Sequence, residues 1–455
     1  MMNKFLMTLS GAAMLVFGAG CGSFVPADYN TLFQKTVQQA GDRVFPSLVY
    51  IKVVQENLVS GRRSSSSSSG SGVVISADGE VVTNNHVIDK AVSIRCLLND
   101  GRAFDARVIG CDKDTDLALL KLDLPENSPP LPYAEFASVP AVEGEFVMAL
   151  GAPWGLNRSI SIGIISCAKR YLPGHSLYSL WYQSDAAISP GNSGGPLINT
   201  DGKIVGINTL GMFAAGALAF TIPSETVQIV AGRLRKYNKV NWAWFGLQLQ
   251  PLKDFERNIY LDAVSGVLIA GTDPGSPARK ANIEVNDLLL AVDGEKVTAL
   301  TAEELPAIYR KLGLMPFGKK TRFTVLRNGK KLDIECSAAE KGKVEGGEVA
   351  CSNWGFTAKA INRFDTPDLY FYQPEGVFVY GIKKFSPAAR AGLLKGDIIT
   401  RVNNTPVASL DSLLEAYRSA EKRSDADRRS LLTVMRNGVT LQLAVYYNDQ
   451  DNPEY

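Results

Sequence analysis

The sequence predicts a mainly β protein, in which a β-sandwich or a pair of β-barrels precedes two copies of a smaller α+β unit. Two observations predict this fold class. From residue 73 to about residue 225, short apolar runs alternate with turn signals and long helical periodicity is absent, which is typical of a sandwich or barrel pair. In the C-terminal half, stretches that begin at Phe245 and Trp354 repeat one order of motifs, which indicates a repeated structural unit.

The first 21 residues are expected to be a targeting segment. Lys4 precedes a stretch of apolar and small residues, from Phe5 to Gly20, that is too short to span a membrane comfortably. The segment resembles a bacterial lipoprotein signal, in which Cys21 is lipidated after cleavage. The alternative is ordinary signal cleavage nearby, with Cys21 incidental. Either way we predict an exported protein of the cell envelope, periplasmic or lipid-anchored, whose mature chain does not span a membrane.

The elements that follow can be placed in chain order. A short helix is expected over residues 28–43, inside an N-terminal segment of residues 22–45, and a strand over residues 48–54. A helix over residues 225–237 is expected to close the first unit, which spans residues 46–238.

Six consecutive serines, Ser64 to Ser69, lie within residues 55–72 and are flanked by Gly and Arg residues. Stretches of this composition are typical of flexible chain. A mobile loop is therefore expected here.

The two copies are predicted to span residues 244–340 and 350–448, with the Gly-rich, charged residues 341–349 as a linker. Each copy contains Ser-Pro-Ala, an apolar triplet, a helix, and a strand that ends in Arg-Asn-Gly. In the first copy Pro306 interrupts the helical pattern. Because proline is tolerated at the first helical position, the helix is expected to begin at Pro306.

Composition excludes several function classes. The 48 basic and 46 acidic residues give a net charge of +2, which argues against nucleic acid as the main partner. The two histidines, His86 and His175, exclude most His-rich metal sites. No phosphate-binding G-x-x-x-x-G-K-[ST] motif is present, so we expect neither a metal nor another cofactor.

Five cysteines follow Cys21 in the sequence, and no C-x-x-C pair occurs. The turn at residues 99–101 would place Cys96 opposite residue 105 rather than opposite Cys111, so no disulfide is expected between them. We expect all five to be small buried side chains.

Three segments carry residues suited to nucleophilic catalysis. They are VVTNNHVI with His86, DKDTDLALLKL with Asp112, Asp114 and Asp116, and QSDAAISPGNSGGPL with Ser193. Serine is a poor nucleophile unless a base removes its proton, and a carboxylate must orient that base. Glycines around the serine let backbone N–H groups face a developing oxyanion.

The order of these segments along the chain distinguishes between two classes of hydrolase. Residues 191–195 also fit G-x-S-x-G, the nucleophile turn of α/β-hydrolases, but those enzymes carry their histidine after the serine. No histidine follows Ser193, whereas the order His86, acid, Ser193 is that of chymotrypsin-type enzymes. His175, in a Pro-Gly loop, is the alternative base and is expected to be solvated.

The motifs TNNHVI, TDLALLKL, GAPWGL, SIGIIS, QSDAAISPGNSGGPL and FTIP resemble those of the HtrA (Deg) family of serine proteases, in the same order. The resemblance covers nearly the whole mature chain and implies a chymotrypsin-like double β-barrel. It assigns the base to His86, the nucleophile to Ser193 and the orienting acid to Asp116. Asp112 and Asp114 are then expected to be exposed turn residues.

The same resemblance implies an oxyanion hole from the backbone of Gly191 and Ser193, with Asn192. No acid lies between Ala186 and Ser193, so cleavage after small or medium aliphatic residues is expected. The alternative is that the loop expected to form the pocket, residues 207–220, simply packs on the core. The expected pocket residues are Ile188, Ile207, Asn208, Thr209 and Phe220.

The two copies resemble PDZ domains, which add a peptide as an extra strand and hold its C-terminal carboxylate in a backbone loop. The alternative is that the copies are spacers and that the glycines in these loops are turn residues. The expected peptide-binding residues are Trp244, Phe245, Gly246 and Leu247 in the first copy, and Asn353, Trp354, Gly355 and Phe356 in the second.

The resemblance implies an ATP-independent serine endopeptidase that degrades unfolded or misfolded proteins in the cell envelope. It also implies a homotrimer or a multiple of trimers, with residues 22–45 at the contact. Two alternatives stay open. One is a chaperone or peptide-binding scaffold that rarely cleaves, and the other is a signalling protease with one client.

Overall fold

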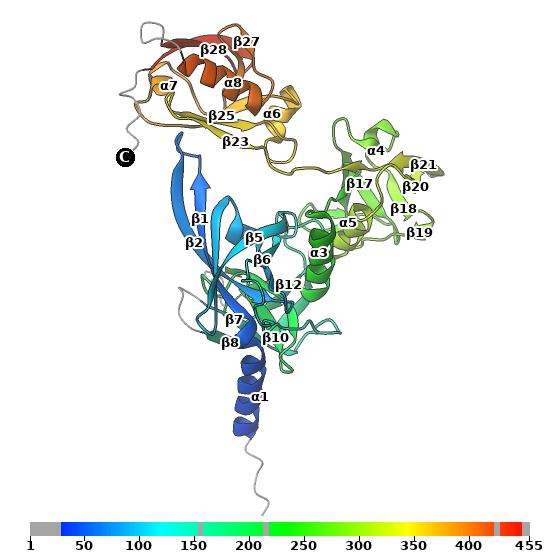
Figure 1. Ribbon diagram of the computed structural model, residues 1–455. Coiled ribbons are helices and arrows are strands. Elements are labelled where there is room, and N and C mark those ends of the chain that lie inside the picture. The colour runs from blue at the N-terminus through cyan, green and yellow to red at the C-terminus, as the bar shows by residue number, and fades with distance from the viewer. Residues whose placement is uncertain (1–28, 153–157, 213–217, 423–427, 448–455) are drawn as a thin grey trace, which may run out of the picture.

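The computed structural model describes residues 29–152, 158–212, 218–422 and 428–447. The predicted targeting segment, with Cys21, lies outside these ranges. The described chain forms two closed β-barrels followed by two α+β units (Figure 1), so the predicted mainly β fold class is confirmed. None of the helices in these ranges is long and apolar enough to cross a membrane.

The first barrel closes six antiparallel strands in the order β1-β2-β3-β6-β5-β4. In β1, Val49, Ile51 and Val53 are fully buried while Lys52 is exposed. This alternation turns one face of the strand toward the barrel core. The strands are β1 (Leu48–Asn57), β2 (Ser64–Val74), β3 (Glu80–Thr83), β4 (Ala91–Leu98), β5 (Ala103–Asp112) and β6 (Leu117–Leu122).

The second barrel has the order β10-β11-β12-β9-β8-β7. Helix α3 (Ser224–Tyr237) follows it, and Val227, Val230 and Leu234 are buried in the core that the two barrels share. This is the closing helix predicted from the sequence. The strands are β7 (Phe146–Gly151), β8 (Ser159–Arg170), β9 (Trp181–Ser184), β10 (Pro196–Asn199), β11 (Ile204–Met212) and β12 (Leu218–Pro223).

The helix expected near the N-terminus is α1 (Tyr29–Val44). It precedes β1 and projects away from the barrels (Figure 1).

The serine-rich segment is a strand, so the prediction of a mobile loop is wrong. β1 and β2 pair without interruption from Leu48 opposite Val73 to Asn57 opposite Ser64. The partner strand supplies the hydrogen bonds, and most of the serine side chains are exposed or half-buried, where a small hydroxyl is well solvated. The hairpin extends from the barrel toward the second α+β unit (Figure 1).

We call the two α+β units the first repeat and the second repeat. The main sheet of the first repeat has the order β14-β17-β18-β20-β21. Its elements are β13 (Ala243–Trp244), β14 (Leu247–Gln250), β15 (Lys253–Asp254), β16 (Ile259–Tyr260), β17 (Val267–Thr272), α4 (Pro277–Lys280), β18 (Leu288–Val292), β19 (Glu295–Lys296), α5 (Leu305–Gly313), β20 (Lys320–Arg327), β21 (Lys330–Ser337) and β22 (Ala339–Glu340).

The main sheet of the second repeat has the order β23-β24-β25-β26-β28-β29. Its elements are β23 (Glu348–Cys351), β24 (Phe356–Ala360), α6 (Pro367–Tyr372), β25 (Val377–Ile382), α7 (Pro387–Arg390), β26 (Ile398–Val402), β27 (Thr405–Pro406), α8 (Leu410–Glu421), β28 (Arg429–Arg436) and β29 (Val439–Tyr446).

The same local geometry recurs in both repeats. Gly246 and Gly355 have φ of +73° and +77°, and a Cβ at either would lie 2.2 Å from the Cβ of Ser276 or Ser386. Each of these serines caps the N-terminus of a short helix, α4 or α7. The repeat predicted from the sequence is therefore a structural repeat.

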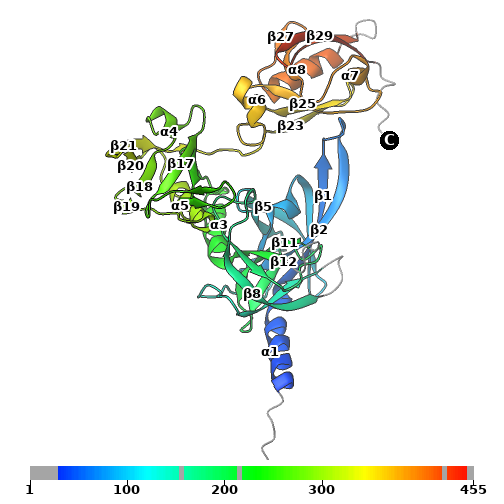
Figure 2. The same ribbon diagram turned by 180° about the vertical axis from the view of Figure 1, so that it is seen from behind.

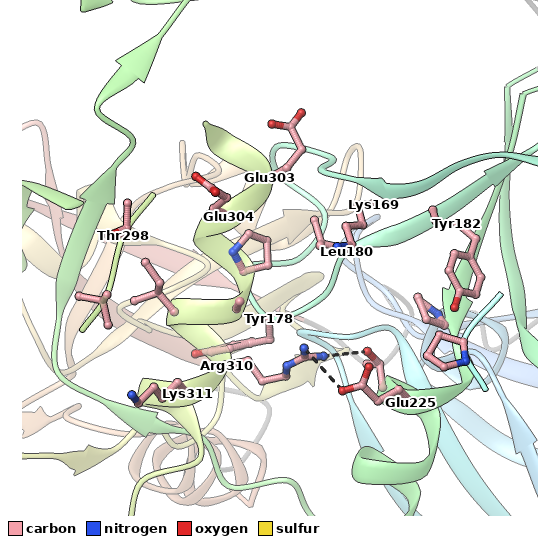
Figure 3. A pocket seen from close by; sticks show the side chains of 18 of the residues that line it. Lys169, Tyr178, Leu180, Tyr182, Glu225, Thr298, Glu303, Glu304, Arg310 and Lys311 are labelled. Carbon is pink, nitrogen blue, oxygen red and sulfur yellow. Dashed lines mark hydrogen bonds and ion pairs between the residues drawn. The ribbon is translucent and has the colours of Figure 1, made fainter. Parts of the chain in front are cut away.

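Helix α5 begins at Leu305, one residue before the predicted start, and Pro306 occupies its first turn. The helix packs beside the second barrel across a cleft of about 620 Å³. Arg310 crosses this cleft, because its guanidinium lies 3.8 Å from the Glu225 carboxylate and donates to the Thr226 hydroxyl at 3.3 Å (Figure 3).

The repeats differ at the strand edge beside their long helix. In the first repeat the outer edge of β14 has no strand partner within the described chain. In the second repeat β23 pairs with the outer edge of β24, from Glu348 opposite Lys359 to Cys351 opposite Phe356, and β23 also contacts α8. The end of the predicted linker is thus part of a strand, and this strand pairs with the sheet edge that stays open in the first repeat.

The five described cysteines are free. Cys96 lies opposite Phe104 in the β4–β5 hairpin, one residue from the expected position. Cys96, Cys336 and Cys351 are buried as predicted, whereas Cys111 is exposed and Cys167 is half-buried. The expectation of five buried side chains is wrong for these two, which lie on β5 and β8.

Candidate active site

The first barrel brings His86 and Asp116 together. His86 lies on α2 (Asn85–Ile88), directly after β3, and Asp116 lies in the turn before β6. Nδ1 of His86 is 2.7 Å from Oδ2 of Asp116, and the His86 backbone N–H donates to Oδ1 at 2.9 Å. The two carboxylate oxygens therefore fix both the ring and the backbone of the histidine.

Asp116 ends a turn that we call the acid loop, residues 112–116. Its φ of +55° lies in the left-handed region, which is uncommon for a residue other than glycine. Its carbonyl accepts hydrogen bonds from the Asn85 N–H at 3.1 Å and from Nδ2 of Asn84 at 3.0 Å. The loop is thereby tied to the helix that carries His86.

Asp112 is buried, so the prediction that it is an exposed turn residue is wrong. Its carboxylate accepts from the Thr115 N–H at 3.1 Å, from the Thr115 hydroxyl at 2.5 Å and from Nε1 of Trp242 at 2.9 Å. Asp114 is also largely covered and pairs with Lys341 at 2.6 Å. The segment forms a turn, as predicted, but the residues that its carboxylates contact lie far away in the sequence.

Asp112 makes the stability of the protein depend on pH. Burial, and then the neighbouring Asp114 carboxylate, raise the pKa of Asp112 to about 6, although Thr115, Trp242 and Lys341 oppose the shift. The ordinary value is about 3.9, so a shift of about two units corresponds to about 3 kcal/mol. Because the folded pKa is raised, this stability is present below about pH 4 and is lost as pH rises through about 6.

We therefore expect Asp112→Asn, which cannot ionise, to gain stability relative to the parent by about 3 kcal/mol between about pH 4 and pH 8. Urea unfolding of both proteins across this range measures the difference. The variant also loses a hydrogen bond from Thr115, which changes its free energy of unfolding equally at every pH. The test is therefore how the difference in free energy of unfolding between the two proteins changes with pH. A difference that does not change with pH would contradict the assignment.

Ser193 lies in the turn between β9 and β10. Its hydroxyl donates to the Thr209 carbonyl at 3.1 Å, and in the part of the chain described here no hydrogen bond joins it to His86. Thr209 sits where the register of β11 shifts between Asn208 and Leu210, and this irregularity accompanies the contact. The Ser193 hydroxyl must leave the Thr209 carbonyl before its proton can pass to His86, and such loose geometry is common without substrate.

The backbone around Ser193 is held by contacts that sequence reasoning missed. The Ser71 hydroxyl donates to the Gly191 carbonyl at 2.6 Å, and the Ser71 N–H donates to the Ser193 carbonyl at 2.8 Å. The Asn208 carbonyl accepts from the Gly194 N–H at 2.8 Å. Ser71 is hidden in a serine- and glycine-rich stretch, and Asn208 is one of the predicted pocket residues, whose contact with this turn no local motif indicates.

The predicted oxyanion donors divide into two groups. Among the described residues, the N–H groups of Gly191 and Ser193 donate to no other protein group, as an oxyanion hole requires. The Asn192 N–H instead donates to the Ser189 carbonyl at 2.9 Å, and its Oδ1 accepts from the Ser159 hydroxyl at 3.2 Å. Asn192 therefore braces the turn, and its predicted part in the oxyanion hole does not fit this geometry.

A cleft of about 320 Å³ opens beside the histidine–aspartate pair, lined by His86, Asp116, Thr209 and Leu210. His175 lies on the same cleft, exposed as expected, with its ring edge toward Trp181 at 6.3 Å between centroids.

Of the five predicted pocket residues, Thr209 lines this cleft. The other four are buried elsewhere, which is the alternative in which the segment packs on the core. Ile207 and Phe220 lie in the shared core of the barrels, Ile188 lies in the core of the second barrel, and the Asn208 side chain donates to the Pro196 carbonyl at 3.0 Å. Residues 213–217 of the predicted pocket loop lie outside the described residues.

The two predicted carboxylate loops also differ. In the first repeat, residues 244–247 line a cavity of about 300 Å³ together with Tyr309 of α5, Lys341 and Phe364. The Leu249 N–H, on the open edge of β14, donates to the Tyr309 hydroxyl at 2.7 Å. In the second repeat, residues 353–356 lead into β24, whose outer edge β23 already occupies.

Comparisons with known proteins agree with this architecture. The family described as "Trypsin-like peptidase domain" matches residues 70–207, and the family described as "PDZ domain" matches residues 244–337 and 355–446. The chain is 34% identical over 396 residues to a probable periplasmic serine endoprotease DegP-like of Pseudomonas putida, covering 84% of this chain and 80% of that protein. It is 34% identical over 360 residues to a protein of the same name from Brucella suis, covering 78% of this chain and 69% of that protein.

Solved structures give the same result. The HtrA-type protease AlgW with a decapeptide is 28% identical, with a TM-score of 0.57, and the match covers 67% of this chain and 99% of AlgW. A serine endoprotease from Yersinia pestis is 28% identical with a TM-score of 0.52, covering 67% of this chain and 97% of that one. The chain belongs to the HtrA (Deg) family of serine endoproteases, as a trypsin-like peptidase followed by two PDZ domains.

Proposed function

We propose that His86, Asp116 and Ser193 are the catalytic triad of this serine endopeptidase. Oγ of Ser193 attacks the peptide carbonyl, His86 accepts its proton and later gives it to the leaving amine, and Asp116 stabilises the imidazolium that forms. The 2.7 Å contact between His86 Nδ1 and Asp116 Oδ2 carries the proposal. It holds the tautomer in which Nε2 is free to accept the serine proton.

The N–H groups of Gly191 and Ser193 are the proposed oxyanion donors. The Asn192 carbonyl, which belongs to the same peptide unit as the Ser193 N–H, accepts from the Gly195 N–H at 2.9 Å, and Ser71 holds the Gly191 carbonyl. These contacts fix the backbone of the turn before substrate arrives. Donors fixed in advance stabilise the charge of the tetrahedral intermediate without having to reorganise during the reaction.

The proposed substrates are unfolded or misfolded proteins in the periplasm or elsewhere in the cell envelope, cut without ATP after small or medium aliphatic residues. Relatives named as periplasmic serine endoproteases support the location. The apolar side chains of Trp181 and Leu210 on the cleft wall support an aliphatic preference. A lipid on Cys21 remains part of this proposal for the mature protein.

The test is to incubate residues 22–455 with an unfolded, aliphatic-rich protein and to follow fragment masses over time, with the Ser193→Ala variant as the blank. Fragments ending in Val, Ala, Ile or Leu from the parent alone support the proposal. Cuts that follow charged or aromatic residues would contradict the proposed specificity. The reaction contains no ATP, so the same experiment tests whether cleavage is independent of ATP.

We also propose that the first repeat binds the C-terminal tails of peptides and that the second does not. The open edge of β14 and the adjoining cavity support binding at the first repeat. A tail that pairs with β14 must replace the Tyr309 hydroxyl on the Leu249 N–H. In the second repeat β23 takes the place of a tail.

A matched pair of glycine variants tests this difference. Gly246→Ala and Gly355→Ala each place a Cβ 2.2 Å from a serine Cβ, at a positive φ, so both carry comparable local strain. We expect Gly246→Ala to weaken tail binding at least about tenfold, since it displaces the backbone that holds the carboxylate. We expect Gly355→Ala to leave tail binding unchanged, and fluorescence titration with a labelled peptide measures both. Equal losses in the two variants would contradict the proposal.

The alternative function, a chaperone or scaffold that rarely cleaves, is favoured by one observation. The Ser193 hydroxyl donates to Thr209, a contact that the serine must leave before it reacts. If the scaffold function dominates, the Ser193→Ala variant will suppress aggregation of an unfolded client as well as the parent does, and the parent will release few fragments. Extensive fragmentation of the client by the parent would contradict the scaffold function and support the protease function.

The protein is also proposed to assemble as a homotrimer or a multiple of trimers, a number that comes from the family resemblance. An exposed apolar patch on α1 and the second barrel supports self-association. Leu32 is 61% exposed and Phe146 is 51% exposed, and the rings of Phe33 and Phe146 lie 5.4 Å apart. Sedimentation equilibrium of residues 22–455 measures the assembly mass.

A further inference from the structure

The acid loop is held by chain that lies more than two hundred residues away in the sequence. We call residues 341–348 the linker segment; it joins the two repeats and passes beside the first barrel (Figure 2). Lys341 Nζ lies 2.6 Å from Oδ1 of Asp114, and Glu345 pairs with Lys113. Two successive residues of the acid loop are therefore paired with the linker segment.

A third pair connects the linker segment to the helix that carries His86. Lys90, two residues after the end of α2, lies 2.8 Å from the Glu348 carboxylate. Both side chains are largely buried, at 24% and 10% exposed. One linker segment thus touches the chain on both sides of the His86–Asp116 contact.

The pair between Asp114 and Lys341 is enclosed, unlike an ordinary surface ion pair. The Lys341 side chain is 8% exposed, and its Nζ lies 5.0 Å from the ring centre of Tyr178 and 5.2 Å from that of Phe364. Exposed ion pairs contribute little because water competes for both charges. A covered pair with two aromatic neighbours fixes its partners far more firmly, and removing one partner leaves a desolvated charge.

A second contact fastens the same loop. The Trp242 Nε1–H donates to Asp112, and the Trp242 ring stacks on Tyr178 with 4.0 Å between centroids. The Lys341 N–H donates to the Trp242 carbonyl at 2.9 Å. The acid loop, the entrance to the first repeat and the linker segment therefore meet in one junction.

The far end of the linker segment is anchored as well. It continues into β23, which is part of the second repeat. The tip of the β1–β2 hairpin rests on that repeat: the Thr357 hydroxyl donates to the Leu58 carbonyl, and a Cβ on Gly381 would lie 2.1 Å from the Val59 carbonyl oxygen. The linker segment is thus held between two contacts with the first barrel.

We propose that Lys341, through its ion pair with Asp114, is a positioning residue for Asp116, so that the linker segment between the repeats is part of the apparatus that aligns the catalytic pair. The inference rests on the proposed triad. Asp116 lies two residues from Asp114, in a backbone conformation that the loop must hold. Catalytic groups must stay within roughly 0.5 Å of their working geometry, and a 1 Å displacement can lower the rate about a hundredfold.

The test is a double-mutant cycle in residues 22–455, with Asp114→Asn, Lys341→Met and both together. The substrate is a short chromogenic peptide with a blocked C-terminus, which has no tail for the repeats to bind. A fluorophosphonate that labels the active serine counts competent sites, so kcat is expressed per labelled site. A merely structural role lowers the number of labelled sites, whereas a positioning role lowers kcat at each site.

We expect each single variant to lower kcat per labelled site about tenfold, with KM changed less than about twofold. The double variant should be no slower than the slower single variant, because residues that act as a unit are not additive. Lys341→Arg should restore most of kcat. Lys239→Met, which breaks an exposed pair with Glu340, is the matched control and should leave kcat unchanged.

Unchanged kcat per labelled site in both single variants would overturn the inference, as would equal losses in Lys239→Met. These outcomes differ from failure of the proposed triad. If the fluorophosphonate labels the parent at a residue other than Ser193, or if Ser193→Ala keeps its activity, the triad itself is wrong.

Discussion

Replacing Ser193 with alanine is expected to lower kcat for peptide hydrolysis by roughly five to six orders of magnitude, since knocking out a triad nucleophile removes the covalent route. The residual rate comes from substrate binding and the oxyanion donors alone. The fold should be unaffected, because the serine side chain makes one hydrogen bond, to Thr209. The contacts of the turn with Ser71 and Asn208 use its backbone, which alanine retains.

The measurement is kcat on a chromogenic peptide together with the melting temperature. Ser128→Ala is a matched control, because this half-buried serine also donates one hydrogen bond to a backbone carbonyl, that of Pro125, and it does not line the cleft. We expect the control to keep full activity. Equal activity in the parent and in Ser193→Ala would show that another residue is the nucleophile, or that a contaminant cleaves the peptide.

The parts of the site that sequence reasoning predicted are those whose signals are local. His86 and Ser193 lie in motifs of a few residues, and chain order distinguished a chymotrypsin-like arrangement from an α/β-hydrolase. The closing helix α3 and the two repeats were also visible, because their apolar periodicity and turn residues are contiguous. A local pattern predicts the structure correctly when the tertiary environment favours the same conformation as the local sequence does.

The serine-rich strand shows the opposite case. Ser64 to Ser69 have no β preference of their own, and their strand is imposed by β1, whose apolar alternation fixes the barrel wall. Propensity is a weak guide where a partner strand decides the structure. The same stretch leads to Ser71, whose contacts with Gly191 and Ser193 join residues about 120 positions apart.

Asp112 and Asp114 were misplaced for the same reason. Their partners Trp242 and Lys341 are 130 and 227 residues away, and nothing in the sequence of the acid loop indicates them. The second repeat gives a third example. Its loop resembles that of the first repeat, but residues 348–351 form a strand on the edge that stays open in the first repeat. The Gly-rich composition of the preceding residues gives no indication of this strand.

Asp116→Asn is expected to lower kcat about ten-thousandfold while leaving the fold intact. The reason lies in the two hydrogen bonds that the carboxylate accepts. The His86 backbone N–H donates to Oδ1, so the amide oxygen of an asparagine must take that position and its NH₂ group must face Nδ1. Nδ1 then becomes an acceptor, the ring proton moves to Nε2, and Nε2 can no longer accept the proton of Ser193.

The asparagine is isosteric, so a loss of this size with an unchanged melting temperature can be assigned to the tautomer rather than to a displaced loop. The measurement is kcat per fluorophosphonate-labelled site at saturating peptide, with Asp123→Asn as control. Asp123 is an exposed carboxylate at the end of β6 on the same barrel and lies 3.8 Å from Arg107, so its loss should not change kcat. A decrease of only about tenfold in Asp116→Asn would mean that the carboxylate merely aligns the ring, because a histidine in the wrong tautomer cannot act as the base.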